Sequence, residues 1–226
     1  MTTDRLTLTA VHDGFVFTAA HEHPQGVRHG GVIVIQEIFG LDRYVQEDVA
    51  RWAERGFEVV APAMFDRQEL GFVAEHDPAG FETGVRYAKA NGPDSAMGDI
   101  QACIDFLAPR GPVFVVGYCY GGTMAWLAAS RCTGLSAAAS YYGGQVAGMA
   151  RFDLSCPVIV HLGREDPHIP ADETKAAIAA AHPDVQVHIY EASGHGFNND
   201  GRPESDLADA QLARERTLAL FLANGV

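Results

Sequence analysis

The chain has 226 residues, of which 47% are hydrophobic, and 16 basic residues against 29 acidic ones give a formal net charge of −13. This length fits one α/β domain, and the composition contains no polar or repetitive tract typical of disorder. Because an acidic surface repels phosphate backbones and anionic lipid, we expect neither a nucleic-acid partner nor a membrane partner.

The N-terminal segment and the cysteines bear on where the protein works. MTTDRLTLTA has an acid and polar residues where a secretory leader needs a long apolar run, and no stretch approaches 18 consecutive apolar residues. The cysteines are scattered and form no CxxC pair. We therefore expect free thiols and a cytoplasmic protein, acting as a monomer or weak homo-oligomer on a small molecule, without a cofactor. The cysteines are Cys103, Cys119, Cys132 and Cys156.

The N-terminal half alternates apolar runs with helical patterns. Residues 6–10 and 14–19 are typical of a short hairpin, and the continuous apolar runs that follow are typical of strands buried on both faces. Residues 62–78 have no clean period, so we expect a loop that shapes a substrate pocket. The predicted strands are 30–36 and 57–62, and the predicted helices are 43–55, 79–90 and 94–107.

The C-terminal half continues this alternation and contains neither a repeat nor a linker. The pattern predicts one domain over residues 1–226, with a mainly parallel sheet covered by helices on both faces. Functional side chains should then follow the carboxyl ends of the strands. The remaining predicted strands are 113–117, 135–141, 157–162 and 185–190, and the remaining helices are 121–131, 171–181 and 205–223.

The segment GPVFVVGYCYGGTMAWLAAS, residues 111–130, carries the most information about chemistry. It is the G-x-S-x-G nucleophile elbow of α/β-hydrolases with Cys119 in place of serine, in the strand–turn–helix setting that this motif requires. The helix start favours a thiolate and a developing oxyanion. A phosphate-binding turn is the alternative, but no GxGxxG or P-loop pattern is present. A buried structural thiol is the other alternative, and we prefer it for the remaining three cysteines.

The acid and the base should follow the nucleophile in that order along the chain. Asp166 comes just after the strand PVIVHLG, in a loop fixed by prolines, and Glu165 is the alternative acid. His195 follows the last strand between two glycines, which allow a sharp loop toward Cys119. The alternatives are that Asp166 lies in a solvated acidic loop and that His195 has no functional role. We expect the other nine histidines to have no functional role.

These positions predict a Cys119–His195–Asp166 triad. The thiolate attacks a carbonyl, and Asp166 fixes the imidazole tautomer. We expect the backbone N–H groups of Tyr120 and Ile38 to form the oxyanion hole. His21-Glu22-His23 superficially suggests a metal site, but no further ligand stands at suitable spacing, so we expect no metal.

A cysteine nucleophile narrows the substrate. A thiolate is a better leaving group than an alkoxide, so the tetrahedral intermediate would tend to expel sulfur before an unactivated alcohol. The chemistry therefore favours esters whose leaving oxygen is already stabilised, such as enol esters and enol lactones.

Several motifs in order resemble the dienelactone hydrolase (carboxymethylenebutenolidase) family of the α/β-hydrolases. They are QEIFG at 36–40, GYCYGG at 117–122, GRED at 163–166, GHGF at 194–197 and ARERT at 213–217. The resemblance implies an α/β-hydrolase fold, ester or lactone hydrolysis, and a role for Glu37, which in the family lies buried beside the resting thiol and helps to generate the thiolate. A plain helix-start acid is the alternative for Glu37.

The resemblance also implies substrate contacts, with two departures from the family. Its best-known members bind the lactone carboxylate with two arginines, one shortly after the histidine and one in the lid region. Here Asn199 stands four residues after His195, and Phe81 falls at the position of the arginine in the lid region. The alternative sources of that charge are Arg67, Arg86 and Arg202, although each is more simply interpreted as a surface residue. The candidate substrate contacts are Tyr118, Phe39, Phe81, Arg86, Phe197 and Asn199.

Three functions stay open from the sequence. The first is hydrolysis of dienelactone or a related enol lactone in aromatic breakdown. The second is a carboxylesterase or thioesterase for other small acyl substrates, favoured by the two missing arginines. The third is a non-catalytic relative that binds a small ligand, which the complete set of triad positions disfavours.

Overall fold

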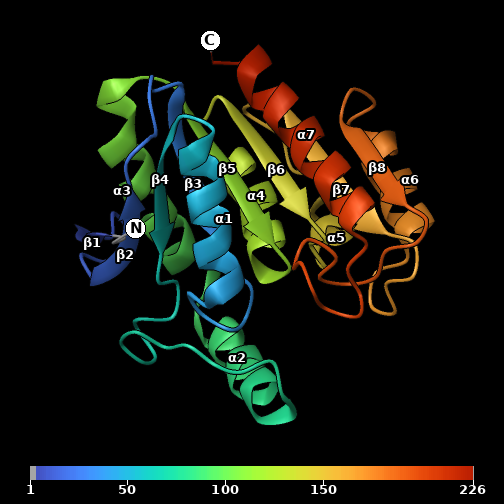
Figure 1. The fold of residues 1–226 in the computed structure, drawn as a ribbon, viewed down its shortest axis with the longest axis horizontal. Coiled ribbons are helices and arrows are strands. Elements are labelled where there is room, and N and C mark those ends of the chain that lie inside the picture. The colour runs from blue at the N-terminus through green and yellow to red at the C-terminus, as the bar shows by residue number, and fades with distance from the viewer. Residues whose placement is uncertain (1–3, 226) are drawn as a thin grey trace.

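The computed structural model describes residues 4–225, and its centre is one eight-stranded sheet (Figure 1). The strand order is β1-β2-β4-β3-β5-β6-β7-β8. Both pairings of β2 are antiparallel, and every other pairing is parallel. The strands are β1 (Asp4–Thr9), β2 (Val16–Glu22), β3 (Gly30–Ile35), β4 (Phe57–Pro62), β5 (Val113–Tyr118), β6 (Ala137–Tyr141), β7 (Val158–Gly163) and β8 (Gln186–Tyr190).

Helices cover both faces of this sheet. Figure 1 shows α1 and α7 in front of the strands and α3 and α4 behind them. The central strands β3 to β7 are buried along their whole length, which explains their unbroken apolar runs. The helices are α1 (Arg43–Glu54), α2 (Pro78–Ala90), α3 (Pro93–Leu107), α4 (Tyr120–Arg131), α5 (Val146–Met149), α6 (Ala171–Ala181) and α7 (Leu207–Ala223), with a 3₁₀ turn η1 (Ala108–Arg110).

The predicted alternation of strands and helices is confirmed, and with it the α/β-hydrolase class. The predicted boundaries lie within three residues of those observed. The sequence did not predict α5 and η1, because one turn is too short to display a helical period. Within the described residues, no helix combines the length and the apolar character needed to cross a membrane.

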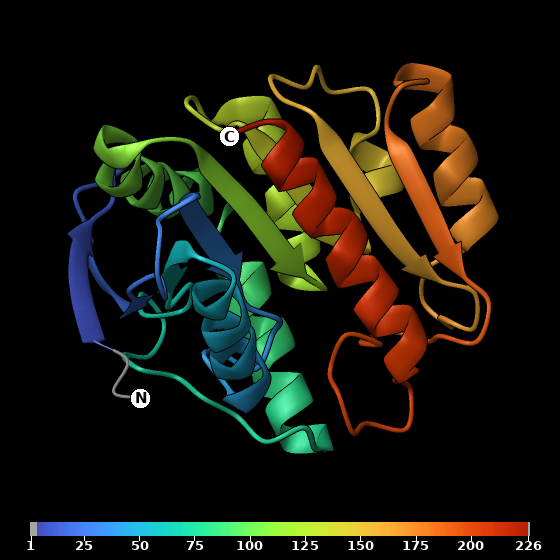
Figure 2. The same ribbon diagram turned by 45° about the horizontal axis from the view of Figure 1, so that its top comes forward.

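Helix α2 lies apart from the two helical layers, beyond the carboxyl ends of the parallel strands (Figures 1 and 2). Gly84 allows this position, because a Cβ there would lie 2.2 Å from the carbonyl oxygen of Ile38. The helix thus rests directly on the segment that follows β3. We expected the 62–78 loop to shape the pocket, but α2 supplies that wall of the site instead.

Candidate active site

Cys119 occupies the turn between β5 and α4 in a backbone conformation that non-glycine residues rarely adopt. Its φ is 54° and its ψ is −111°. The Cys119 amide donates to the carbonyl oxygen of Tyr141 at 3.0 Å, which ties the turn to the end of β6. Such strain persists only where the surroundings enforce it, and it is typical of functional sites. The Cys119 side chain is half-buried.

The glycines that frame Cys119 are required by close backbone contacts. A Cβ on Gly117 would lie 2.0 Å from the carbonyl oxygen of Gly121, and a Cβ on Gly121 would lie 2.3 Å from that of Ile35. The Gly121 amide also donates to the carbonyl oxygen of Gln36 at 3.1 Å. The turn therefore packs against the end of β3, where the second predicted oxyanion segment begins.

His195 and Asp166 meet at this edge of the sheet, although 29 residues separate them. The His195 Nδ1 lies 2.7 Å from Asp166 Oδ2. The other carboxylate oxygen, Oδ1, accepts hydrogen bonds from the amides of His168 at 2.8 Å and Ile169 at 3.2 Å. Asp166 is thereby fixed by its own loop, while Glu165 is exposed and its backbone amide donates to the Ser193 carbonyl.

The electrostatics of this pair favour a charged imidazole. Burial lowers the pKa of His195, but its hydrogen bonds and charge interactions with Asp166 and Cys119 outweigh burial and raise the pKa to about 10. Burial raises the pKa of Asp166, but its hydrogen bond and charge interaction with His195 lead to a net lowering. An ionised Asp166 beside a protonated His195 is the arrangement that supports a neighbouring thiolate.

Two cavities meet at Cys119 and His195. The larger compartment has a volume of about 430 Å³, and the smaller compartment has a volume of about 220 Å³. Ile38 and His168 also contribute to both compartments, whereas Tyr120 contributes only to the larger one. The first-turn amides of a helix have no partner within the helix, and Tyr120 is the first residue of α4. Both predicted oxyanion residues therefore border the space in front of Cys119.

Glu37 is buried and lines the smaller compartment. Its Oε2 accepts a hydrogen bond from Asn199 Nδ2 at 3.1 Å, while Oε1 has no partner within residues 4–225. Burial, assisted by the charge of Asp42, raises the pKa of Glu37 above its ordinary value. Burial raises the pKa of the Tyr142 phenol, and a negative charge on the nearby Glu37 would raise it further.

The predicted substrate contacts divide into two groups. Phe39 and the half-exposed Phe81 do line the smaller compartment. The other four line neither compartment: Tyr118 is buried and donates its hydroxyl proton to Asp48, Phe197 is fully buried, Asn199 binds Glu37, and Arg86 is exposed with its guanidinium over the Tyr87 ring.

Of the three arginines considered from the sequence, only Arg202 reaches the site. Arg67 is engaged elsewhere, by Asp13 at 2.8 Å and Asp99 at 2.5 Å. Arg202 lines the smaller compartment, forms an ion pair with Glu204 at 3.4 Å and hydrogen-bonds His76 Nδ1. Its charge is therefore already shared with neighbours in the described chain.

Two aromatic residues at the site were not predicted. His168, for which we expected no functional role, lines both compartments, and the centroid of its ring lies 5.7 Å from that of His195. Tyr142 has a φ of 38°, and its ring lies 5.1 Å from that of His195. Tyr142 directly follows β6, so the rule that functional residues lie beyond strand ends could have indicated it.

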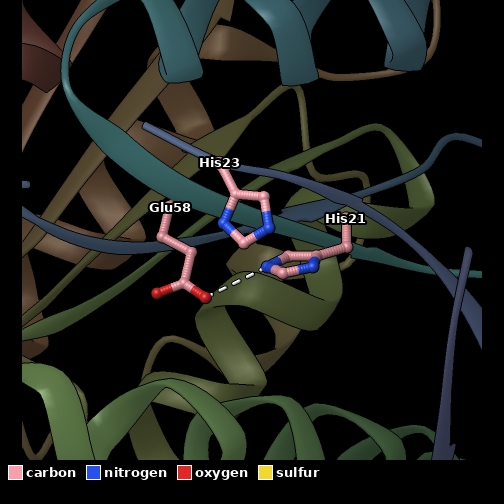
Figure 3. A group of neighbouring side chains, drawn as sticks. All are labelled: His21, His23 and Glu58. Carbon is pink, nitrogen blue, oxygen red and sulfur yellow. Dashed lines mark hydrogen bonds and ion pairs between the residues drawn. The ribbon is translucent and has the colours of Figure 1, made fainter. Parts of the chain in front are cut away.

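The group of His21, His23 and Glu58 is the one arrangement in the described residues that resembles a metal site (Figure 3). Glu58 accepts hydrogen bonds from His21 at 3.0 Å, from Arg28 at 2.9 Å and from Arg110 at 2.9 Å. Despite burial, these partners lower the pKa of Glu58 to about 2. A cation there would have to compete with two guanidinium groups, so we assign no metal to this cluster.

Comparisons with known proteins agree with this geometry. The dienelactone hydrolase family matches residues 17–224. The carboxymethylenebutenolidases of Pseudomonas putida and of Pseudomonas knackmussii are each 29% identical to the chain over 221 residues, covering 94% of this chain and 93% of theirs. A protein of Klebsiella pneumoniae subsp. pneumoniae MGH 78578, crystallised as a candidate dienelactone hydrolase, superposes with a TM-score of 0.82 at 26% identity, covering 96% of this chain and 98% of the other.

These matches span nearly the whole chain and rank the three functions left open by the sequence. They support an enzyme that hydrolyses esters or lactones, and they leave no basis for a non-catalytic binding protein. The chain belongs to the dienelactone hydrolase family and is a carboxylic ester hydrolase with the α/β-hydrolase fold.

Proposed function

We propose that the protein hydrolyses an enol lactone or a small ester through a Cys119–His195–Asp166 triad and an acyl-thioester intermediate. One observation carries the proposal. The imidazole of His195, held by Asp166 at 2.7 Å, borders the same cavity as the strained Cys119 at the start of α4. This arrangement supports the assignment of Cys119 as the nucleophile, His195 as the base and Asp166 as the group that orients the base.

The first half-reaction forms the thioester. The Cys119 thiolate, whose proton is held by His195, attacks the carbonyl carbon and forms a C–S bond. The carbonyl oxygen becomes an oxyanion that accepts hydrogen bonds from the amides of Ile38 and Tyr120. The intermediate collapses by breaking the bond to the leaving oxygen, and that oxygen takes the proton from the imidazolium. In a lactone, this step opens the ring.

The second half-reaction releases the acid. His195 removes a proton from a water molecule, whose oxygen attacks the thioester carbonyl. Collapse expels the Cys119 thiolate and frees the carboxylic acid, while the imidazole keeps the proton. Asp166 stabilises the imidazolium during both halves.

Glu37 has a supporting role in this proposal. Its buried, partly unpaired carboxyl group favours the neutral form at rest. A neutral Glu37 adds no negative charge that would oppose the formation of a thiolate at Cys119. The carboxymethylenebutenolidase relatives suggest dienelactone as the substrate, and other small esters or thioesters are the alternative.

The test is the hydrolysis of 4-nitrophenyl acetate together with capture of the intermediate. Cys119→Ala should lower kcat/KM by at least about 10³-fold, because the nucleophile is removed. Cys156→Ala, a half-buried thiol outside the site, should leave kcat/KM unchanged. Rapid acid quenching of the wild-type reaction should yield a mass increase on the peptide that contains Cys119. Normal hydrolysis by folded Cys119→Ala would contradict the proposal.

A further inference from the structure

The two compartments beside Cys119 differ in chemistry, and this difference bears on the substrate class. The larger compartment is bounded by the C-terminal half of α2, the first turns of α4 and the segment around α5. Its walls are mostly apolar side chains: Val85, Ala88, Met124, Met149 and Ile169. Among residues 4–225, no acidic residue lines it. Its cations are the His195 imidazolium, which is shared with Asp166 and Cys119, and Lys89, an exposed residue of α2.

The smaller compartment is rich in acidic groups. Glu37, Glu165 and Glu204 line it. Its two cations already have partners: Arg202 pairs with Glu204 at 3.4 Å, and the His195 imidazolium pairs with Asp166 at 2.7 Å. Burying a carboxylate is costly unless a cation or several donors meet it. Neither compartment therefore offers an unshared, buried cation for the carboxylate of an anionic lactone.

The position of the base assigns the two sides of the ester to the two compartments. His195 must deliver a proton to the leaving oxygen, so the leaving group lies on the side of the imidazole loop. Gly194 and Gly196 of that loop line only the smaller compartment, whereas Tyr120, beside the nucleophile, lines only the larger one. His195 itself lines both compartments, so its flanking glycines and Tyr120 are what distinguish them, and this difference favours the larger compartment for the acyl group.

We infer that the substrate is an uncharged ester or thioester whose apolar acyl group occupies the larger compartment, rather than a lactone that carries a carboxylate. This inference rests on the proposed function and names the substrate class of the same site. The volume of about 430 Å³ is within the range of small-molecule pockets and exceeds what an acetyl group fills.

The first experiment compares 4-nitrophenyl esters that share one leaving group. From acetate through butanoate to hexanoate, kcat/KM should rise by about tenfold or more, since each buried methylene contributes up to about fourfold. The monoanionic 4-nitrophenyl hydrogen adipate should react about tenfold or more slowly than methyl 4-nitrophenyl adipate, in which the charge is masked.

Two outcomes overturn the inference. One is a kcat/KM that stays flat or falls with acyl length, and the other is a preference for the anionic adipate. If Lys89→Gln then removed that preference, the carboxylate site would be assigned to Lys89. The proposed function fails separately, if wild type does not hydrolyse the acetate ester or if folded Cys119→Ala still hydrolyses it.

A matched pair of variants tests the compartment itself. Ala88→Leu narrows the larger compartment, whereas Ala90→Leu makes the same change two residues later, at an exposed position outside it. Ala88→Leu should lower the hexanoate-to-acetate ratio of kcat/KM by about fivefold or more, and Ala90→Leu should not.

An unchanged ratio in folded Ala88→Leu overturns the assignment of the acyl group. If Ala88→Leu does not fold, Gly144→Leu replaces it, because Gly144 lines the same compartment and a Cβ there meets no atom within 4 Å. The expected and contrary results are the same for that variant.

Discussion

At the scale of residues, the environment of His195 changes its protonation. Its imidazole is bonded to Asp166 at 2.7 Å, and its pKa is raised to about 10. The unfolded chain has an ordinary imidazole with a pKa of about 6.5. The folded protein therefore retains a proton on His195 that the unfolded chain loses as the pH rises from about 6.5 to about 10.

This difference predicts a pH-dependent stability. The protonated His195 stabilises the fold fully below about pH 6.5, and that stabilisation is lost as the pH rises toward about 10. The free energy of unfolding of wild type minus that of His195→Gln should therefore fall over this interval, as measured by urea denaturation. A difference that stayed constant between these pH values would contradict the charged imidazole.

Glu37 should also make the stability depend on pH, in this case through a buried carboxyl group. Its raised pKa means that the folded state holds a proton which the unfolded chain releases above about pH 4.5. Wild type should lose stability relative to Glu37→Gln as the pH rises above about 4.5. The exposed Glu82→Gln should show no such trend in urea denaturation. A stability difference between wild type and Glu37→Gln that did not change as the pH rose above about 4.5 would refute this account.

At the scale of elements, the site depends on how closely the Cys119 turn approaches the end of β3. Gly121 lies between them, and a Cβ on it would lie 2.3 Å from the Ile35 carbonyl oxygen and 2.6 Å from that of Gln36. These contacts are with backbone atoms, which cannot rotate away. The spacing of the two predicted oxyanion amides, Ile38 and Tyr120, is thus set by a residue without a side chain.

Gly121→Ala should consequently separate these two segments. We expect a loss of about 1–3 kcal/mol in the free energy of unfolding, and a fall in kcat larger than any change in KM. Gly148→Ala is the matched control, because its added Cβ meets no atom within 4 Å and it lies outside both compartments. Equal behaviour of the two variants in denaturation and kinetics would show that the close approach is unimportant.

Local sequence patterns predicted every strand and every helix of the described chain except α5 and η1, and they also gave the candidate triad. Cys119, Asp166 and His195 each sit in a short turn directly after a strand, so a motif of a few residues identifies them. The parallel sheet then brings the ends of distant strands to one edge. The contact between His195 and Asp166 follows from that topology.

The compartments could not be predicted, because segments far apart in the sequence form their walls. Tyr118 and Phe197 stand beside catalytic motifs, yet both side chains point into the core. Asn199 binds Glu37 across 162 residues, a contact that no local pattern encodes. His168 reaches the site because its backbone amide also fixes Asp166.

At the scale of the whole molecule, the net charge of −13 acts on every anionic ligand. It adds a long-range repulsion to the lack, among the described residues, of an unshared buried cation in the compartments. Salt screens this repulsion over a Debye length of about 10 Å at 0.1 M. The effect concerns the approach of a substrate, whereas the compartments determine what is bound.

Salt should accordingly distinguish the two contributions. Raising sodium chloride from about 0.02 M to about 0.5 M should increase kcat/KM for the anionic adipate ester about twofold or more relative to its methyl ester. The local preference for the neutral ester should remain at high salt. A salt response that is equal for both esters would exclude a role for the overall charge.

The central claim is that Cys119 is the activated nucleophile, and the rate of alkylation tests it most directly. The other three thiols are poor nucleophiles, because burial raises the pKa of Cys103 well above its ordinary value, that of Cys132 to about 12 and that of Cys156 to about 11.

With iodoacetamide near neutral pH, peptide mass spectrometry should find Cys119 modified first, with ester hydrolysis lost in proportion. If Cys119 reacted no faster than the other thiols, or if the alkylated enzyme kept its activity, the assignment of the nucleophile would be contradicted.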